Sequence, residues 1–273
     1  MRQLTFLCFL LLLLFEVHGQ TDPLTQVHGA RSQGMGNLRV HGLDTWSYFN
    51  NPGGLAKLEE SAIAAGYDNR FGLKELSTVD LVGAWKVDAG TWGFGVSHYG
   101  GKLFNQQALG VAFANQLGIV SIGAKLEWFQ TQIEGFGSGH SAIFSLGGMA
   151  ELSPKFSIGA SISNLNRSKI SKDSESRLPT GVSLGLRYTP ISELQLHLEV
   201  EKDISIKPIV KAGLEYAIRD WIFLRTGINS NPSRIFFGIG LKSSRLNLDY
   251  AYGQNQALGS THHLSLGLSF SKK

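Results

Sequence analysis

Residues 260–270 read STHHLSLGLSF, and their alternation of large apolar with small or polar side chains decides the fold class. Leu264, Leu266, Leu268 and Phe270 fall on one face of an extended chain, and the residues between them fall on the other. The same period of two recurs in stretches of about ten residues from residue 61 onward. Such stretches predict tilted antiparallel strands that are long enough to cross a bilayer.

Fourteen strands are expected, and an even number is what bacterial single-chain barrels require. Their expected ranges are 61–71, 77–88, 91–100, 106–117, 119–133, 140–153, 155–166, 179–189, 193–203, 206–218, 220–230, 233–244, 245–254 and 260–270. Turn-forming residues separate them, and the longest connection, Asn166 to Pro179, is predicted to be an exposed loop. The predicted fold class is therefore all-β, a transmembrane antiparallel β-barrel of about fourteen strands.

The composition supports this prediction. Of 273 residues 33 are glycine, 17% are charged and 10% are aromatic, which argues against a disordered chain and against a coiled coil. The alternative fold is a soluble β-sandwich or solenoid, whose polar face is usually charged. Here the polar face of the strands is mostly glycine and serine, which favours the narrow lumen of a barrel. Seven aromatic residues near expected strand ends predict an interfacial girdle: Tyr99, Trp128, Tyr188, Tyr216, Trp221, Tyr250 and Tyr252.

The start of the chain predicts export. Residues 1–19 combine Arg2, an apolar stretch and a small-residue exit, which is typical of a cleaved secretory signal peptide; an uncleaved anchor is the alternative. The lone cysteine, Cys8, lies in this segment, so the mature chain would have none. A disulfide-free exported chain without another apolar span of about 20 residues predicts the outer membrane of a Gram-negative cell.

Residues 20–60 lack sustained alternation and carry a different signature. They contain Gly29-Ala30-Arg31-Ser32-Gln33-Gly34-Met35-Gly36, then Asp44, then Asn50-Asn51-Pro52-Gly53-Gly54-Leu55-Ala56. This segment resembles the N-terminus of the FadL-like superfamily of outer-membrane barrels, which includes the PorV/PorQ-type proteins of type IX secretion. Gly53 stands where that family usually has alanine, and Asn37-Leu38-Arg39 replaces its small-residue run.

The resemblance implies a fourteen-stranded barrel over 61–273 with an N-terminal plug, or hatch, over 20–60. The plug motif comprises Gly34, Gly36, Asp44, Asn51, Pro52, Gly53 and Gly54. The turn at Asn51 is expected within the barrel or at its periplasmic mouth, with Asn51 bonded to the lumen. The segment either only seals the barrel or moves to gate a hydrophobic ligand.

Charged residues on the polar face are expected to line the lumen and to pair across strands. They are Lys125, Glu127, Arg187, Glu199, Glu201, Lys211, Glu215 and Asp249. Such charges form a neutralised wall or the lining of an ion-selective pore.

The sequence gives little support for an enzyme or for a nucleic-acid-binding protein. Ser183 has nucleophile-elbow spacing in Gly181-Val182-Ser183-Leu184-Gly185, but it lies inside one alternating strand rather than at a sharp turn, so no enzyme is predicted. His262 and His263 point to opposite faces of a strand, so neither a metal nor a cofactor is expected. The net charge is +4 without a basic cluster, which argues against nucleic-acid binding.

Two functions stay open at this point. One is a FadL-like conduit for hydrophobic small molecules, and the other is a PorV/PorQ-like interaction component of type IX secretion or surface attachment. The expected partners are outer-membrane lipid with either a hydrophobic small molecule or secretion-system proteins. About fifteen residues per strand leave only short loops, which disfavours capture of a ligand by long outer loops.

Overall fold

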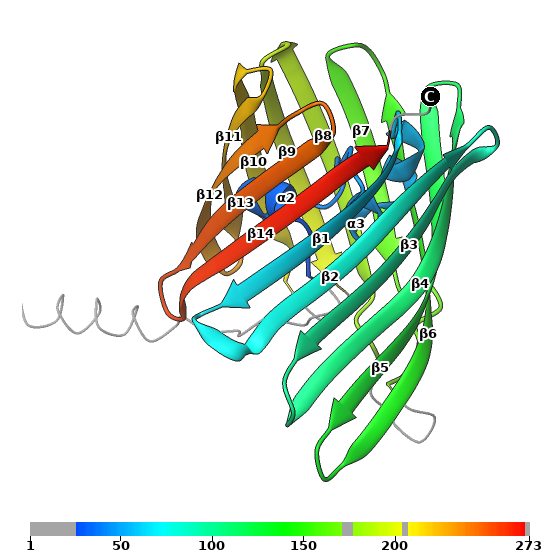
Figure 1. Cartoon of the computed structure of the whole chain (residues 1–273), viewed down its shortest axis with the longest axis vertical. Coiled ribbons are helices and arrows are strands. Elements are labelled where there is room, and N and C mark those ends of the chain that lie inside the picture. Colours follow the sequence, from blue (N-terminus) through cyan, green and yellow to red (C-terminus); the bar gives the residue numbers. More distant parts are fainter. Residues whose placement is uncertain (1–25, 171–176, 204–206, 271–273) are drawn as a thin grey trace, which may run out of the picture.

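The computed structural model describes residues 26–170, 177–203 and 207–270, which form a closed antiparallel barrel of fourteen strands around a short internal segment (Figure 1). Each strand pairs with its neighbours in sequence, and β1 closes the barrel by pairing with β14. The prediction of an all-β barrel with fourteen strands is confirmed. The expected signal peptide, with Cys8, lies outside the described residues.

The strand boundaries follow the expected segments closely. The strands are β1 (Ser61–Arg70), β2 (Leu73–Val87), β3 (Gly90–Gly100), β4 (Phe104–Leu117), β5 (Val120–Ile133), β6 (Gly137–Glu151), β7 (Phe156–Ser163), β8 (Gly181–Ile191), β9 (Leu194–Asp203), β10 (Ile209–Arg219), β11 (Ile222–Ser230), β12 (Ser233–Lys242), β13 (Leu246–Asn255) and β14 (Gly259–Phe270). The expected extension of β7 to residue 166 is wrong, because Asn164 takes a φ of 53°, which ends an extended strand. β8 likewise begins two residues later than expected.

The two ends of the barrel differ in their connections. At the end that holds Ser61 and Phe270, here called the terminal end, all connections are short. The opposite end, where Arg70 pairs with Thr261, is here called the distal end, and it carries the longest connection, 164–180. Strands β3 to β6 also extend beyond the others at the distal end (Figure 1).

The outer face of the barrel is an apolar band. Leu264, Leu266 and Leu268 of β14 point outward, while His263 and Ser265 are buried inside. The same division holds in β5, where Ile122, Leu126 and Trp128 are exposed, while Lys125 and Glu127 are buried on the lumenal side. An outer apolar band with an inner polar face is the arrangement of a membrane-spanning barrel. The described residues include no helix that is apolar enough and long enough to cross a membrane.

One residue of the expected aromatic girdle is misplaced. Tyr99 does not face outward but is only 6% exposed inside the barrel, close to Phe104 and the distal end. It belongs to the inward set of β3 because it lies an even number of residues from the buried Thr91 and Gly93. Trp128, Tyr216, Trp221 and Tyr250 are exposed, as a girdle requires.

Candidate functional site

Residues 26–60, here called the lumenal segment, lie inside the barrel. They contain only short helical pieces: α2 (Ala30–Gly34), α3 (Ser47–Asn50) and the 3₁₀ helix η2 (Pro52–Lys57). Helices of four to six residues are unstable alone, so contacts with the barrel wall must hold them. The lumenal segment therefore depends on its contacts with the barrel wall for an ordered conformation.

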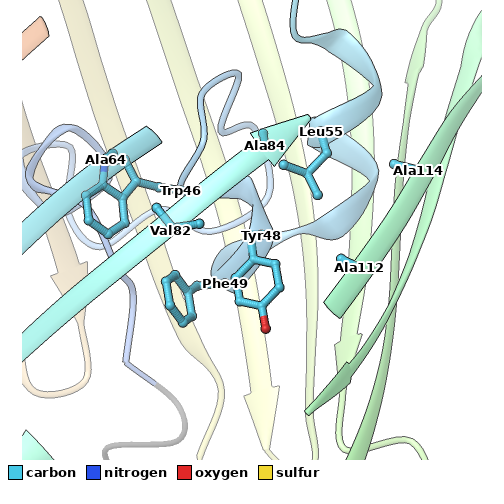
Figure 2. Packing of buried hydrophobic residues seen from close by; sticks show 9 residues of the cluster. All are labelled: Trp46, Tyr48, Phe49, Leu55, Ala64, Val82, Ala84, Ala112 and Ala114. Atoms are coloured by element: carbon cyan, nitrogen blue, oxygen red, sulfur yellow. The ribbon is translucent and has the colours of Figure 1, made fainter. Parts of the chain in front are cut away.

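A central apolar cluster fastens the segment to strands β1 to β4 (Figure 2). Trp46, Tyr48 and Phe49 come from the segment around α3, and Leu55 comes from η2. Small wall residues receive them: Ala64, Val82, Ala84, Ala112 and Ala114. Tyr48 and Leu55 are both 0% exposed. Large side chains of the segment thus fill the space that alanines leave inside the barrel.

Wall glycines let the backbone of the segment approach the strands directly. A Cβ atom at Gly227 would lie 2.1 Å from the carbonyl carbon of Met35, and one at Gly123 would lie 2.4 Å from that of Pro52. Gly95 similarly faces the ring of Tyr48, which a Cβ would approach to 2.1 Å. The glycine and serine face noted in the sequence therefore includes a docking surface for the lumenal segment.

Asn51 occupies the centre of the plug motif. Its Nδ2 donates to the Val40 carbonyl at 2.8 Å and to the Gly148 carbonyl of β6 at 3.3 Å, and its Oδ1 accepts from Gly53 N. Pro52 begins η2, where a missing N–H costs nothing. Gly53 packs on the Gly148 backbone, since a Cβ there would lie 2.6 Å from its Cα. The structure places this turn inside the barrel, in the half nearer the terminal end.

Gly54 follows in η2 and packs against Gly42 and Ser47, whereas Gly34, Gly36 and Asp44 lie on the opposite side of the lumen. Gly34 packs against Gly238 of β12, and Gly36 takes a φ of 86° beside the backbone of Ile228. Asp44 accepts from Trp46 N at 3.0 Å and lies 3.7 Å from an Arg31 guanidinium nitrogen. Burial raises the pKa of the Asp44 carboxyl above its usual range, although Arg31 acts against this shift.

A charged network links the lumenal segment to strands β10, β11 and β13. Arg31 of α2 donates to Glu215 through two nitrogens, at 2.8 and 2.7 Å. Glu215 also binds Arg225 at 2.6 Å, and Arg225 reaches Asp249 at 2.5 Å. Paired guanidinium and carboxylate groups of this kind are strong, directional contacts. A cavity of about 280 Å³ lies beside this network, toward the terminal end.

A second network is centred on Glu199 of β9. Its Oε2 accepts the backbone N–H groups of Arg39 and Val40, both at 2.8 Å, while Oε1 lies 3.3 Å from Lys211 Nζ. Lys211 also binds Glu201 at 2.5 Å and donates to the Asn37 carbonyl. The Glu199 carboxylate of the barrel wall therefore accepts hydrogen bonds from two backbone N–H groups of the lumenal segment.

The remaining predicted lumen charges follow the expected pattern only in part. Lys125 and Glu127 pair at 2.8 Å within strand β5 rather than across strands, and Lys125 also donates to the Phe49 carbonyl. Arg187 makes no ion pair with a described residue. Five of the eight predicted charges are buried: Lys125, Glu127, Glu199, Lys211 and Glu215. Several of them bind the segment rather than line an open pore.

Sequence reasoning missed several residues of these networks. Arg31 and Arg39 of the segment, and Arg225 of the wall, were not singled out, nor were the buried pairs His28–Asp80 and Asp68–His263, at 2.8 and 2.9 Å. Arg225 had a local signal, because it is the inward charged residue of an alternating strand. Arg31 had none, since nothing local connects it to a carboxylate 184 residues away.

Apolar surface continues from the central cluster toward the distal end. Phe129 of β5 and Ile143 of β6 face inward and pack with Leu178 of the 164–180 connection. A cavity of about 50 Å³ separates this distal cluster from the central one, and both Phe129 and Phe49 line it. Apolar side chains therefore face the lumen in two separate clusters, and the cavity between them is lined by Phe49, Ala108 and Phe129 together with polar residues such as Gln106 and Gln107.

No protein-family model and no curated protein matches this sequence. Solved structures do resemble it. The toluene transporter TbuX of Ralstonia pickettii superposes with a TM-score of 0.70 at 10% identity, over 90% of this chain and 99% of that chain. The toluene transporter TodX of Pseudomonas putida gives 0.64 at 14% identity, over 89% and 98%.

A Pseudomonas aeruginosa FadL homologue gives a TM-score of 0.60 at 13% identity, over 89% of this chain and 98% of that chain. Identities this low establish a shared fold and nothing more. With respect to fold, this chain is a complete fourteen-stranded barrel of the type seen in these three proteins.

Proposed function

We propose that this protein is an outer-membrane conduit for small hydrophobic molecules, with the lumenal segment as its plug. The apolar outer band supports insertion into a membrane. The signal peptide that the sequence predicts supports the Gram-negative outer membrane as the location, with the terminal end in the periplasm. The distal end then faces the cell exterior.

The observation that carries the proposal is the run of lumenal apolar side chains. It begins at the distal cluster of Phe129, Ile143 and Leu178, is interrupted at the small cavity, whose lining includes polar residues such as Gln106 and Gln107, and resumes at Phe49 and the central cluster. A hydrophobic molecule moving along it would exchange water for apolar contact, at about 25 cal/mol per Å² of apolar surface buried. The fold shared with two toluene transporters and a FadL homologue supports the same class of cargo.

The plug must move for anything to pass, because its helices and loops are packed against glycines on several strands. The proposed function therefore includes movement of the lumenal segment as the step that opens the conduit. The interaction role in type IX secretion or surface attachment draws no support from the described residues or from the compared structures.

The test is toluene uptake into reconstituted vesicles. Phe129→Gln makes the route polar, and uptake should fall about tenfold, the effect of losing roughly 1.4 kcal/mol of apolar contact. The matched control is Phe236→Gln, since Phe236 is also a buried lumenal phenylalanine but lies on β12, away from the route. Equal uptake by the two variants would refute the route, and toluene exclusion by the wild type would refute the conduit.

A further inference from the structure

A second cavity lies just inside the distal opening, on the side of the barrel away from the apolar route. Its volume is about 100 Å³. It lies between the lumenal segment, which contributes Gln26 and Gln33, and the ends of strands on the β10–β14 and β1 side. Arg70, at the end of β1, and Arg234, at the start of β12, both line it.

Neither of these two arginines makes a hydrogen bond or an ion pair with a residue that the structure describes, although the carboxylates of Asp68 and Asp80 act on Arg70 from a longer distance. Arg70 is only 9% exposed, yet no hydrogen bond or ion pair joins its guanidinium to a described residue. The Nε of Arg234 is a buried donor without an acceptor, and so is the Nε2 of Gln26. Three sets of unpaired donors therefore border one small space.

The neighbouring carboxylates are already engaged. Asp68 binds His263 at 2.9 Å and accepts from Gln33, and Asp80 binds His28 at 2.8 Å. Glu201, which also lines the cavity, lies 2.5 Å from Lys211. These carboxylates are therefore shared with other cationic or hydrogen-bonding groups, and none of them forms an ion pair with Arg70 or Arg234.

Buried charges without a partner are costly, and two like charges beside one cavity add repulsion. An anion bound between them would remove both penalties. A guanidinium binds a carboxylate or phosphate through two parallel hydrogen bonds, so paired arginines suit an oxyanion better than they suit chloride.

We propose that this cavity binds a small oxyanion, a carboxylate or a phosphate group, between Arg70 and Arg234. The anion arrives through water from the distal opening rather than from the bilayer, because the site lies inside the closed strand wall. The two arginines do not line the cavity of the apolar route, although Gln26 borders both cavities. This inference goes beyond the proposed conduit, since anion binding at equilibrium requires no transport.

The test is calorimetric titration of the detergent-solubilised full-length protein with inorganic phosphate and with acetate at low ionic strength. Saturable binding of either anion to one site is expected. Arg70→Gln and Arg234→Gln should each weaken it about tenfold, the scale of one charge-assisted bidentate contact. Lys74→Gln removes the same charge from an exposed position near the same end and should change the affinity less than about twofold.

Two results would overturn the proposal. The first is the absence of saturable binding by the wild type up to about 10 mM of either anion, a concentration that already represents weak affinity. The second is wild-type affinity in the double variant Arg70→Gln, Arg234→Gln. Heat-modifiable mobility reports whether each variant is folded, and Arg234→Gln alone still tests the site if Arg70→Gln does not fold. Toluene uptake tests the conduit separately, so either proposal can fail while the other stands.

Discussion

Single side chains hold the lumenal segment where its own helices cannot. Asn51 is fully buried and joins three separate pieces of backbone: Val40 and Gly53 of the segment and Gly148 of the wall. His41 is buried beside His197, with ring centres 5.9 Å apart, and its Nε2 has no hydrogen-bond partner. Both residues link the plug to the barrel, and each supports a prediction.

Replacing Asn51 with alanine should destabilise the docked segment by about 1–3 kcal/mol, because it leaves buried carbonyl groups without their donor. The measurement is limited proteolysis of the segment in reconstituted protein, where cleavage should become faster. Asn115→Ala, on the exposed face of β4, is the control. Unchanged protection in Asn51→Ala would show that its bonds are dispensable for docking.

Acid should loosen the plug through His41. Burial, together with the charge of Arg187, lowers the pKa of His41 to about 4 from an ordinary 6.5. The released segment therefore binds more protons than the docked one between these values, so docking is unaffected above pH 6.5 and weakens as the pH falls toward 4. The loss is at most about 3 kcal/mol.

Channel conductance recorded from pH 7.5 to 4.5 checks this prediction. Conductance of the wild type should rise on acidification, and His41→Gln should flatten that rise. His140→Gln, on the outer side of β6, should behave like the wild type. A rise of the same size in His41→Gln would assign the acid response to other groups.

At the scale of elements, strands and segment are complementary in size. Glycines of β3, β5 and β11 occur where the segment's backbone or rings lie against the wall, while alanines of β1, β2 and β4 receive its large apolar side chains. The same alternation that sends large residues outward leaves small residues inward. A strand can therefore face lipid with one set of residues and bind the plug with the other.

Gly227→Ala should displace the segment around Met35, because the new Cβ would lie 2.1 Å from the Met35 carbonyl carbon. Overpacking of this kind costs about 1–3 kcal/mol, and faster proteolysis between α2 and α3 would report it. In Gly83→Ala the nearest atom to the new Cβ lies 3.7 Å away, so this variant should match the wild type. If the segment around Met35 were equally protected from proteolysis in Gly227→Ala and Gly83→Ala, the barrel wall rather than the segment would have shifted to accommodate the new Cβ.

At the scale of the whole molecule, we expect the barrel to fold without the lumenal segment. Strand pairing closes the barrel without the segment, and Glu199 and Glu215 keep Lys211 and Arg225 as partners when Arg31 and Arg39 are absent. Each of these two carboxylates therefore keeps one cationic partner within the wall. A fourteen-stranded barrel without contents is wide enough for water and solutes.

Deleting residues 20–55 should raise single-channel conductance in a planar bilayer severalfold while the barrel stays folded. Heat-modifiable mobility in gels checks folding, and full-length protein refolded in parallel is the control. A folded deletion variant with unchanged conductance would mean that this segment does not block the lumen, and the gating part of the proposed function would fall.

The sequence by itself determined the barrel. All fourteen strands, their inward and outward faces, and the departure of residues 20–60 from that pattern follow from periodicity, because alternation is a local property of an extended backbone. Tyr99 shows that the alternation is more informative than residue type. Its position in β3 predicts that it faces the lumen, whereas its aromatic ring and its place near a strand end suggested the girdle.

Only the tertiary structure decided the contacts inside the barrel. Arg31 meets Glu215, Gly227 meets Met35, and Arg70 shares a cavity with Arg234, although each pair is far apart in the chain. These contacts depend on closure of β1 with β14 and on the register that sets strand heights around the ring. Periodicity fixes which face a residue takes, but closure and register fix which residues meet across the lumen.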